Sequence, residues 1–188
     1  MARHDIVVIG ASIGGVEALS TLVGRLPPGF AAAVFVSLSL GADPLRYLPD
    51  ILSRAGPLPA THPADGDEVL AGRIHVVPPG RRMRLEGGRM VMPDVPAGRG
   101  GNQADLLFES AALFYGARVV GVVLTGWDGD GAAGLAAIGR AGGARIVQDP
   151  AEAAAPSMPL SALASAGAEI LPVHAIAARL VALSLDEG

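Results

Sequence analysis

The 188-residue sequence contains neither cysteine nor lysine. Without cysteine, the chain can form no disulfide framework, no thiolate metal site and no cysteine nucleophile. All 14 basic residues are arginine, which excludes a Walker-type phosphate loop, a Schiff-base enzyme and a dehydrogenase with a Tyr-x-x-x-Lys pair. These two absences remove several large classes of enzyme.

Long apolar runs are also missing. No stretch approaches the roughly 20 apolar residues that span a bilayer, and the start of the chain, with Arg3 and His4, does not resemble a secretory signal. Only 17% of the residues are charged and the net charge is −4, so neither a nucleic-acid groove nor an anionic membrane surface is indicated. We therefore expect a soluble, cytoplasmic protein that neither inserts into membranes nor binds nucleic acid.

The hydrophobic content of 51% is sufficient for a sizeable core, and we expect one domain over residues 1–188. Apolar residues recur at helical spacing across 16–26, 107–114 and 132–138. Short β-branched runs that end at Gly or Pro predict strands at 6–10, 32–38, 73–78, 118–126, 144–148 and 169–173. Strands without polar alternation are buried on both faces, so this pattern predicts an α/β fold with a doubly wound, mostly parallel sheet and helices on both faces.

One segment departs from this alternation of strands and helices. Residues 82–92 have Gly87-Gly88 between two similar short runs, which predicts a small β-hairpin that protrudes as an antiparallel flap. Residues 93–103 are rich in Pro and Gly, and we expect them to form a loop.

The loop at residues 10–15 follows the first expected strand and reads G-x-S-x-G-G. Its glycines allow a tight turn, and the start of the next helix offers free N–H groups there. Ser12 is then either an exposed nucleophile or a cap on the helix that begins near Gly15. A nucleotide-binding role is disfavoured, because the G-x-G-x-x-G fingerprint and its acidic ribose clamp are absent.

A second glycine-rich loop, residues 124–134, also joins a strand to a helix and carries Asp128 and Asp130 at its mouth. An aspartate there is either a carboxylate that works with Ser12 or the N-cap of the helix expected at 131–141. Ligand sites in open α/β sheets form outside the carboxyl ends of the strands. We therefore expect the two loops to share one site.

Five stretches of the chain, taken in order, resemble the catalytic domain of the CheB-type protein-glutamate methylesterases of bacterial chemotaxis. They are VVIGASIGGVEAL, RIHVVPPGRRMRLEGGRM, DLLFESAA, GVVLTGWDGDGAAGLAAIGRAGG and IVQDPAEAAAPSMP, and the resemblance extends over residues 5–183. It implies a doubly wound α/β domain that hydrolyses glutamate methyl esters on chemoreceptors with a serine, a histidine and an aspartate. Ser12 matches the family serine, and Asp130 matches the family aspartate.

The family histidine has no counterpart in this chain. In the family it ends the second strand, where this sequence reads VFVSLSLGADP and places Ser39. No histidine occurs between His4 and His62, so no shift of the alignment supplies one. A serine nucleophile needs a base of near-neutral pKa, and losing a triad histidine typically costs on the order of 10⁴- to 10⁶-fold in rate. We therefore predict a degenerate triad of Ser12, Asp130 and Ser39.

None of the four histidines is expected to replace that base. His174 would reproduce the chain order of the α/β-hydrolases, but it begins the last helical stretch, where a surface position is the alternative. His75 lies in an expected strand, where a structural role is favoured, and His62 lies in a connection. The histidines have no metal-ligand spacing, and we expect neither a metal nor another cofactor.

Other site residues come from the two loops and the expected hairpin. We expect Ile13, Gly14 and Trp127 to contribute oxyanion- or substrate-binding groups, since the resemblance implies that the backbone N–H at the second turn stabilises the oxyanion. Trp127 stands where the family usually has methionine, and it either packs in the turn or fills part of the substrate groove. Arg82 and its neighbouring arginines face either an acidic receptor helix or solvent.

Three hypotheses follow. The chain is an ester hydrolase of the methylesterase family, a catalytically silent module that binds a chemoreceptor or a related signalling protein, or an anion-binding domain that uses the 10–15 loop. The last is the least favoured. We expect no receiver domain before residue 5, and hence no control by phosphorylation within the chain.

Overall fold

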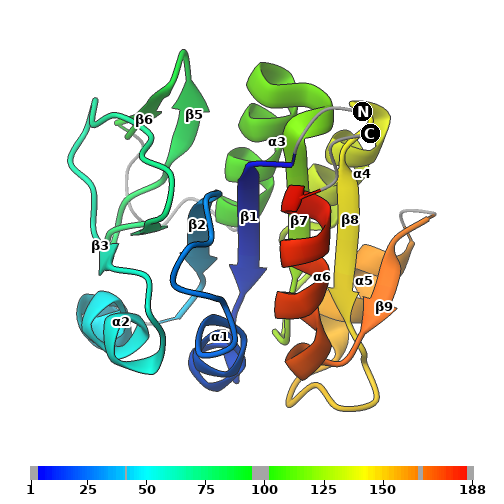
Figure 1. Ribbon diagram of the computed structural model, residues 1–188. Coiled ribbons are helices and arrows are strands. Elements are labelled where there is room, and N and C mark those ends of the chain that lie inside the picture. Colours follow the sequence, from blue (N-terminus) through cyan, green and yellow to red (C-terminus); the bar gives the residue numbers. More distant parts are fainter. Residues whose placement is uncertain (1–3, 41, 95–101, 165–166, 186–188) are drawn as a thin grey trace.

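The computed structural model describes residues 4–40, 42–94, 102–164 and 167–185. Seven strands form one sheet in the order β3-β4-β2-β1-β7-β8-β9, and every neighbouring pair in it is parallel (Figure 1). The strand bounds are β1 Ile6–Ala11, β2 Ala33–Leu38, β3 Ala60–Thr61, β4 Ile74–Val76, β7 Val119–Val123, β8 Ala144–Gln148 and β9 Glu169–Leu171. The predicted α/β fold with a parallel sheet is confirmed.

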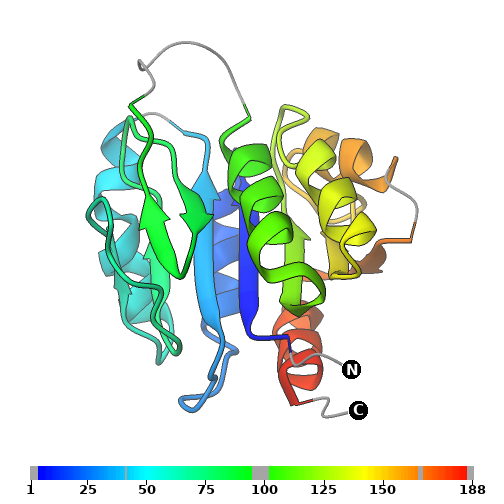
Figure 2. The same cartoon turned by 90° about the horizontal axis from the view of Figure 1, so that it is seen from above.

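Helices cover both faces of this sheet, and a buried hydrophobic cluster lies beneath each helical layer (Figures 1 and 2). One layer consists of α1 (Gly15–Val23), α2 (Ala42–Ala55) and α6 (Val173–Leu185). The other consists of α3 (Gln103–Tyr115), α4 (Ala132–Arg140) and α5 (Ser157–Leu163), and a short 3-10 helix, Gly116–Arg118, leads into β7. Within the described ranges, no helix is long and apolar enough to cross a membrane.

The first strand, β1, lies at the centre of the sheet. The strands that follow it in the chain extend the sheet first on one side of β1 and then on the other. β2 and β4 extend the sheet on one side of β1, while β7 and β8 extend it on the other. The helices that follow β1 and β7 therefore cover opposite faces, and the carboxyl ends of these two strands are where such sheets form ligand sites. The loop after β1 carries Ser12, and the loop after β7 carries Asp130.

Side chains alternate between the two layers along β1. Its odd-numbered residues pack in the cluster beneath α1, whereas Ile6 and Val8 pack beneath α3. Gly10 continues the α3 row, and a Cβ placed there would lie only 2.9 Å from the Cβ of Ala104. The strand alternation therefore directs Ser12 to the α3 side of the sheet.

The elements differ from the sequence predictions mainly in length. The strand expected at 118–126 ends at Val123. Beyond it, Thr125 donates its N–H to the side-chain Oε1 of Gln148, the last residue of β8, at 2.8 Å rather than to a backbone carbonyl. The strand expected at 73–78 is confined to Ile74–Val76. The sequence patterns do not predict the edge strand β3 or the helices α2 and α5.

The predicted hairpin is present. β5 (Arg84–Glu86) and β6 (Arg89–Val91) pair in antiparallel orientation, and the two residues between them, Gly87 and Gly88, both have positive φ, at 56° and 80°. Only glycine adopts this conformation readily, which is why the Gly-Gly pair predicted the turn. The loop expected at 93–103 lies largely outside the described residues.

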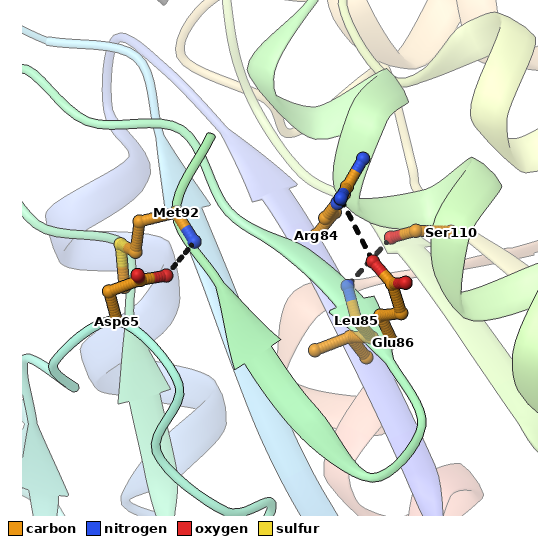
Figure 3. Close-up of polar contacts among 6 residues, drawn as sticks. All are labelled: Asp65, Arg84, Leu85, Glu86, Met92 and Ser110. Atoms are coloured by element: carbon orange, nitrogen blue, oxygen red, sulfur yellow. Dashed lines mark hydrogen bonds and ion pairs between the residues drawn. The ribbon is translucent and has the colours of Figure 1, made fainter. Parts of the chain in front are cut away.

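One face of this hairpin packs against α3, while its turn is exposed. Leu85 and Met90 are buried in the hydrophobic cluster beneath α3. The N–H of Leu85 donates to Oγ of Ser110 on α3 at 3.0 Å, and Oδ1 of Asp65 accepts the N–H of Met92 at 2.7 Å (Figure 3). Both sides of the hairpin are therefore attached to the body of the domain.

Helix α2 was not predicted because proline interrupts its sequence. Pro49 lies inside the helix and has no N–H, so the carbonyl O of Leu45, four residues earlier, lacks its helical donor. His62 lies there instead: its Nε2 is 3.1 Å from that carbonyl O, and its Nδ1 is 3.0 Å from the carbonyl O of Val76 in β4. The imidazole thus ties α2 to the sheet.

We expect His62→Leu to lower the free energy of unfolding by about 1–3 kcal/mol, because the imidazole between the partly buried carbonyl groups of Leu45 and Val76 is lost and, with it, the N–H that it donates. Pro49→Ala supplies a helical N–H to Leu45, so the same His62→Leu change should cost less in that background. Chemical denaturation of the four proteins measures this coupling as a double-mutant cycle. An equal cost in both backgrounds would contradict the assignment.

Candidate active site

Ser12 lies directly after β1 and is buried, with 5% of its surface exposed. Its N–H donates to the carbonyl O of Thr125 at 3.0 Å, and its Oγ donates to the carbonyl O of Ser39 at 3.1 Å. The alternative that Ser12 caps the next helix is wrong, because the residue preceding α1 is Gly14 and no side chain there bonds to the helix. The hydroxyl of Ser12 instead faces the end of β2.

Ser39 lies beside Ser12 because β1 and β2 are paired with Ala11 opposite Leu38. The pairing continues one residue further, since Ser39 donates its N–H to the carbonyl O of Ala11 at 2.9 Å. The half-buried Ser39 is held by its backbone, and its hydroxyl bonds to nothing in the part of the chain that the structure describes. Position 39, directly after β2, therefore lies beside the candidate nucleophile.

Asp130 follows β7 and is buried, with 4% of its surface exposed. Its Oδ2 accepts the N–H of Ala104 at 2.9 Å, and its Oδ1 accepts the N–H of Asp105 at 3.0 Å, both in the first turn of α3. Burial raises the pKa of Asp130 above its ordinary value, and the two N–H groups oppose that shift less strongly. The alternative that Asp130 caps α4 is wrong, because the residue preceding α4 is Gly131 and the carboxylate of Asp130 binds N–H groups of α3 instead.

A carboxylate of α3 in turn accepts a backbone N–H at the amino end of α4. Oδ1 of the buried Asp105 accepts the N–H of Gly134 in α4 at 2.7 Å. The first turn of α3 therefore binds the carboxylate of Asp130, from the loop before α4. The first turn of α4 binds the carboxylate of Asp105, from α3. Carboxylates at this end of a helix satisfy N–H groups that lack helical partners and interact favourably with the helix dipole. The exchange connects α3 firmly to the loop that carries Asp130.

Ser12 and Asp130 approach the amino end of α3 from two neighbouring strands. β1 and β7 are adjacent and parallel, so their carboxyl ends lie at the same edge of the sheet. A Cβ placed on Gly126, in the loop of Asp130, would lie 2.8 Å from the Cβ of Ser12. Ala104, whose N–H binds Asp130, also packs against Gly10 in β1. The two loops therefore lie next to each other at one edge of the sheet.

The expected oxyanion donors lie at the same edge. Ile13 and Trp127 are exposed, at 50% and 70%, on either side of the contact between Ser12 and Gly126. The N–H groups of Ile13, Gly14 and Trp127 donate to no acceptor among the described residues. Three backbone N–H groups without an acceptor therefore lie in the two loops beside Ser12.

Arg82 belongs to a segment that lies against α3. The carbonyl O of Arg81 accepts Nε2 of Gln103, the first residue of α3, at 3.1 Å. Arg82 itself is half-buried. This arrangement brings the arginine-rich segment to the amino end of α3, near the loop of Asp130.

None of the histidines bonds to Ser12 or Asp130 among the described residues. His174 is exposed at the start of α6 and has no hydrogen-bond partner there, as the surface alternative predicted. His75 is buried in β4, with Nε2 3.1 Å from the carbonyl O of Leu70 and Nδ1 without a partner, so its structural role is only partly satisfied. Burial lowers the pKa of His75.

A cavity of about 410 Å³ lies between the sheet and the hairpin, away from this group of residues. None of the expected site residues lines it. Its lining consists of Thr61, Pro63, Asp67, Glu68, Leu70, Arg73, His75 and Met90.

Two residues of the site, Thr125 and Asp105, were assigned no role from the sequence. Thr125 is fully buried between the two loops, and Asp105 holds α4. The only available signal for Thr125 was its place directly after a buried strand and before a glycine-rich loop. The contacts of both residues are made to segments far away in the sequence, which no local pattern shows.

The fold and these residues define a class of protein. It is an open, parallel α/β domain in which the loops after two adjacent strands carry a serine, a carboxylate and free backbone N–H groups. The chain matches the family described as CheB methylesterase over residues 7–180, and it belongs to that family.

Individual relatives agree with this assignment. The chain is 39% identical to protein-glutamate methylesterase/protein-glutamine glutaminase 3 of Geobacter sulfurreducens, over 87% of this chain and 45% of that protein. It is 37% identical to the enzyme of the same name from Anaeromyxobacter dehalogenans, over 95% of this chain and 53% of that protein. It therefore spans about half the length of these curated relatives.

A solved structure has the same fold. The crystal structure of the Thermotoga maritima CheB methylesterase catalytic domain superimposes with a TM-score of 0.86 at 26% identity, and the match covers 97% of this chain and all of that one. The resemblance inferred from the five sequence stretches is thereby confirmed.

We expect Asp130→Ala to lower the free energy of unfolding by about 1–3 kcal/mol, because two buried N–H groups of α3 lose their acceptor. Glu109→Ala changes an exposed carboxylate on the same helix and should stay within about 0.5 kcal/mol of the unsubstituted chain. Urea denaturation of the three proteins tests this. Similar stabilities for the two variants would contradict a capping role for Asp130.

The pH dependence of stability should report the burial of Asp130. Because burial raises the pKa of this carboxyl, the folded state binds its proton more tightly than the unfolded state does. Between the ordinary and the raised pKa, the free energy of unfolding therefore falls as the pH rises. Asp130→Asn removes this titration, so the stability difference between the two proteins should change across that range. A difference that moves in favour of the unsubstituted chain with rising pH would contradict this.

Proposed function

We propose that this chain is a protein-glutamate methylesterase-like domain that acts at glutamate side chains of a methyl-accepting chemoreceptor, with Ser12 as the nucleophile and Asp130 as the carboxylate of its catalytic group. The observation that carries the proposal is the convergence of Ser12, position 39 and Asp130 at the ends of adjacent strands. Family membership and the printed names of the relatives support the reaction class.

The reaction requires an acyl transfer at the γ-carbonyl carbon of a glutamate methyl ester. The Ser12 oxygen attacks that carbon, the C–OCH₃ bond breaks, methanol leaves, and water then releases the acyl group as glutamate. The free N–H groups of Ile13, Gly14 and Trp127 are the candidates to stabilise the oxyanion. The serine proton must pass to a base and then to the leaving methoxide.

The base is the missing component. In the proposed site Ser39 stands where the family has histidine, and a hydroxyl does not accept a proton near neutral pH. A site without this base retains only the contribution of the oxyanion donors and substrate binding, on the order of 10⁴- to 10⁶-fold below an intact triad. We therefore propose that methyl-ester hydrolysis by this chain is very slow.

How much the missing base lowers the rate depends on the leaving group of the substrate. A p-nitrophenolate leaves without a proton, so its ester tests only the activation of Ser12. Methoxide needs a proton from a general acid to leave efficiently, and the ammonia released from a glutamine side chain requires one absolutely. The glutaminase reaction in the names of the relatives is therefore expected to suffer most in this chain.

A second candidate function is a catalytically silent module that binds a chemoreceptor segment or a related signalling protein. It is favoured by the hydrogen bond from the Ser12 hydroxyl to the backbone of Ser39, which holds the proton of the nucleophile on a group that cannot remove it. The exposed side chains of Ile13 and Trp127 offer an apolar contact surface around the serine.

We expect Ser39→His to restore hydrolysis of p-nitrophenyl acetate and of a methylated glutamate peptide, because it would place an imidazole beside the hydroxyl of Ser12. Turnover should rise by at least about 10³-fold over the unsubstituted chain. The double variant Ser39→His/Ser12→Ala controls for hydrolysis by the imidazole itself and should be inactive.

Two results would change the proposal. If the unsubstituted chain already hydrolyses the peptide ester and Ser12→Ala abolishes that activity, the base is not missing, and His174→Gln then tests whether His174 supplies it. If Ser39→His remains inactive and an organophosphonate fails to label Ser12 in it, the hydrolase proposal fails and the binding module is favoured.

A further inference from the structure

Thr125 connects the two loops of the site, although it was assigned no role from the sequence. It lies two residues after β7 and is 1% exposed. Its carbonyl O accepts the N–H of Ser12 at 3.0 Å, and its Oγ1 donates to the carbonyl O of Ile13 at 2.9 Å. Thr125 thus binds the Ala11–Ser12 peptide through its carbonyl O and the Ile13–Gly14 peptide through its hydroxyl.

The single hydroxyl proton of Thr125 has a clear preferred acceptor. The carbonyl O of Ala155 is the other neighbour of Oγ1, at 3.3 Å, but it already accepts the N–H of Gly126 at 2.9 Å. Oγ1 in turn accepts the N–H of Ala155 at 2.9 Å. The hydroxyl is therefore oriented by an N–H on one side and donates to Ile13 on the other.

The hydrogen bond from Thr125 to the carbonyl O of Ile13 also fixes the direction of the Gly14 N–H. The C=O of Ile13 and the N–H of Gly14 belong to the same planar trans peptide, so they point in opposite directions. The C=O points inward to the buried Thr125, and the N–H of Gly14 therefore points away from it. That N–H has no acceptor among the described residues, and it lies two residues after Ser12 at the start of α1.

The peptide needs such a restraint because glycine follows it. Gly14 has φ of 77°, and glycine changes between positive and negative φ at little cost, so the Ile13–Gly14 peptide can rotate unless its C=O is held. A rotation would turn the C=O toward the position of an oxyanion and remove the N–H from it. Gly14 also packs on Thr125, since a Cβ there would lie 3.2 Å from Cγ2 and 3.3 Å from Oγ1.

We propose that Thr125 is a positioning residue whose hydroxyl holds the Ile13–Gly14 peptide so that the Gly14 N–H is presented to the oxyanion formed at Ser12. Thr125 touches neither the substrate nor the reacting atoms, and it acts through the peptide alone. The catalytic part of this inference rests on the proposed function, whereas the orientation of the peptide does not.

Thr125→Val and Thr125→Ser separate the hydroxyl from the packing, because valine keeps the shape and serine keeps the hydrogen bond. Thr61→Val, at an exposed edge position, is the matched control. In the Ser39→His background, Thr125→Val should lower kcat by about 10²-fold with KM nearly unchanged, and Thr125→Ser should restore most of it. Loss of activity in both Thr125 variants, or in neither, would overturn the proposal.

NMR of the chain without Ser39→His tests the hydrogen bond from the Thr125 hydroxyl to Ile13 directly, and it requires no turnover. The Thr125 hydroxyl proton should exchange slowly and show contacts with the Hα protons of Gly14. The carbonyl ¹³C signal of Ile13 should move upfield in Thr125→Val and return in Thr125→Ser. An unchanged Ile13 signal, or a rapidly exchanging hydroxyl in the unsubstituted chain, would overturn the positioning role. A shifted signal together with an inactive Ser39→His protein supports the positioning role and contradicts only the hydrolase proposal.

Discussion

The carboxylate of Asp130, held by two backbone N–H groups at the start of α3, is the interaction on which the site depends. It attaches the loop after β7 to a helix that also packs on β1, and so it sets how far the carboxylate lies from Ser12. The bond is strong because a buried charge meets unpaired N–H groups at the positive end of a helix. This contact also gives Asp130 a structural purpose that is independent of any reaction.

Position 39 differs from Asp130 in this respect. Ser39 is held by its own backbone, through its N–H to Ala11 and its carbonyl O to Ser12, and its side chain supports nothing else in the described part of the chain. A change of the side chain at position 39 therefore removes no hydrogen bond among the described residues, whereas loss of the carboxylate at position 130 removes two hydrogen bonds to α3.

The sequence predicted most of the fold, because the central strands are continuous apolar runs and the loops after them are rich in glycine. It did not predict α2, since Pro49 breaks the helical pattern and the compensating donor, His62, lies 13 residues away along the chain. The two loops of the site were predictable from their motifs. The actual partners of Asp130 and Thr125 were not, because local rules assign a carboxylate to the helix that follows it, and Asp130 binds the helix that precedes it.

The exchange of carboxylates between α3 and α4 has a consequence for how the domain folds and opens. Neither helix can satisfy its amino-terminal peptide groups from its own sequence, so neither is complete until the two have docked. Local unfolding of one then exposes buried donors in the other, which joins them into a single cooperative unit. The corner that carries Asp130 thus shares the stability of the core around it, and it resists the fraying that is usual for long surface loops.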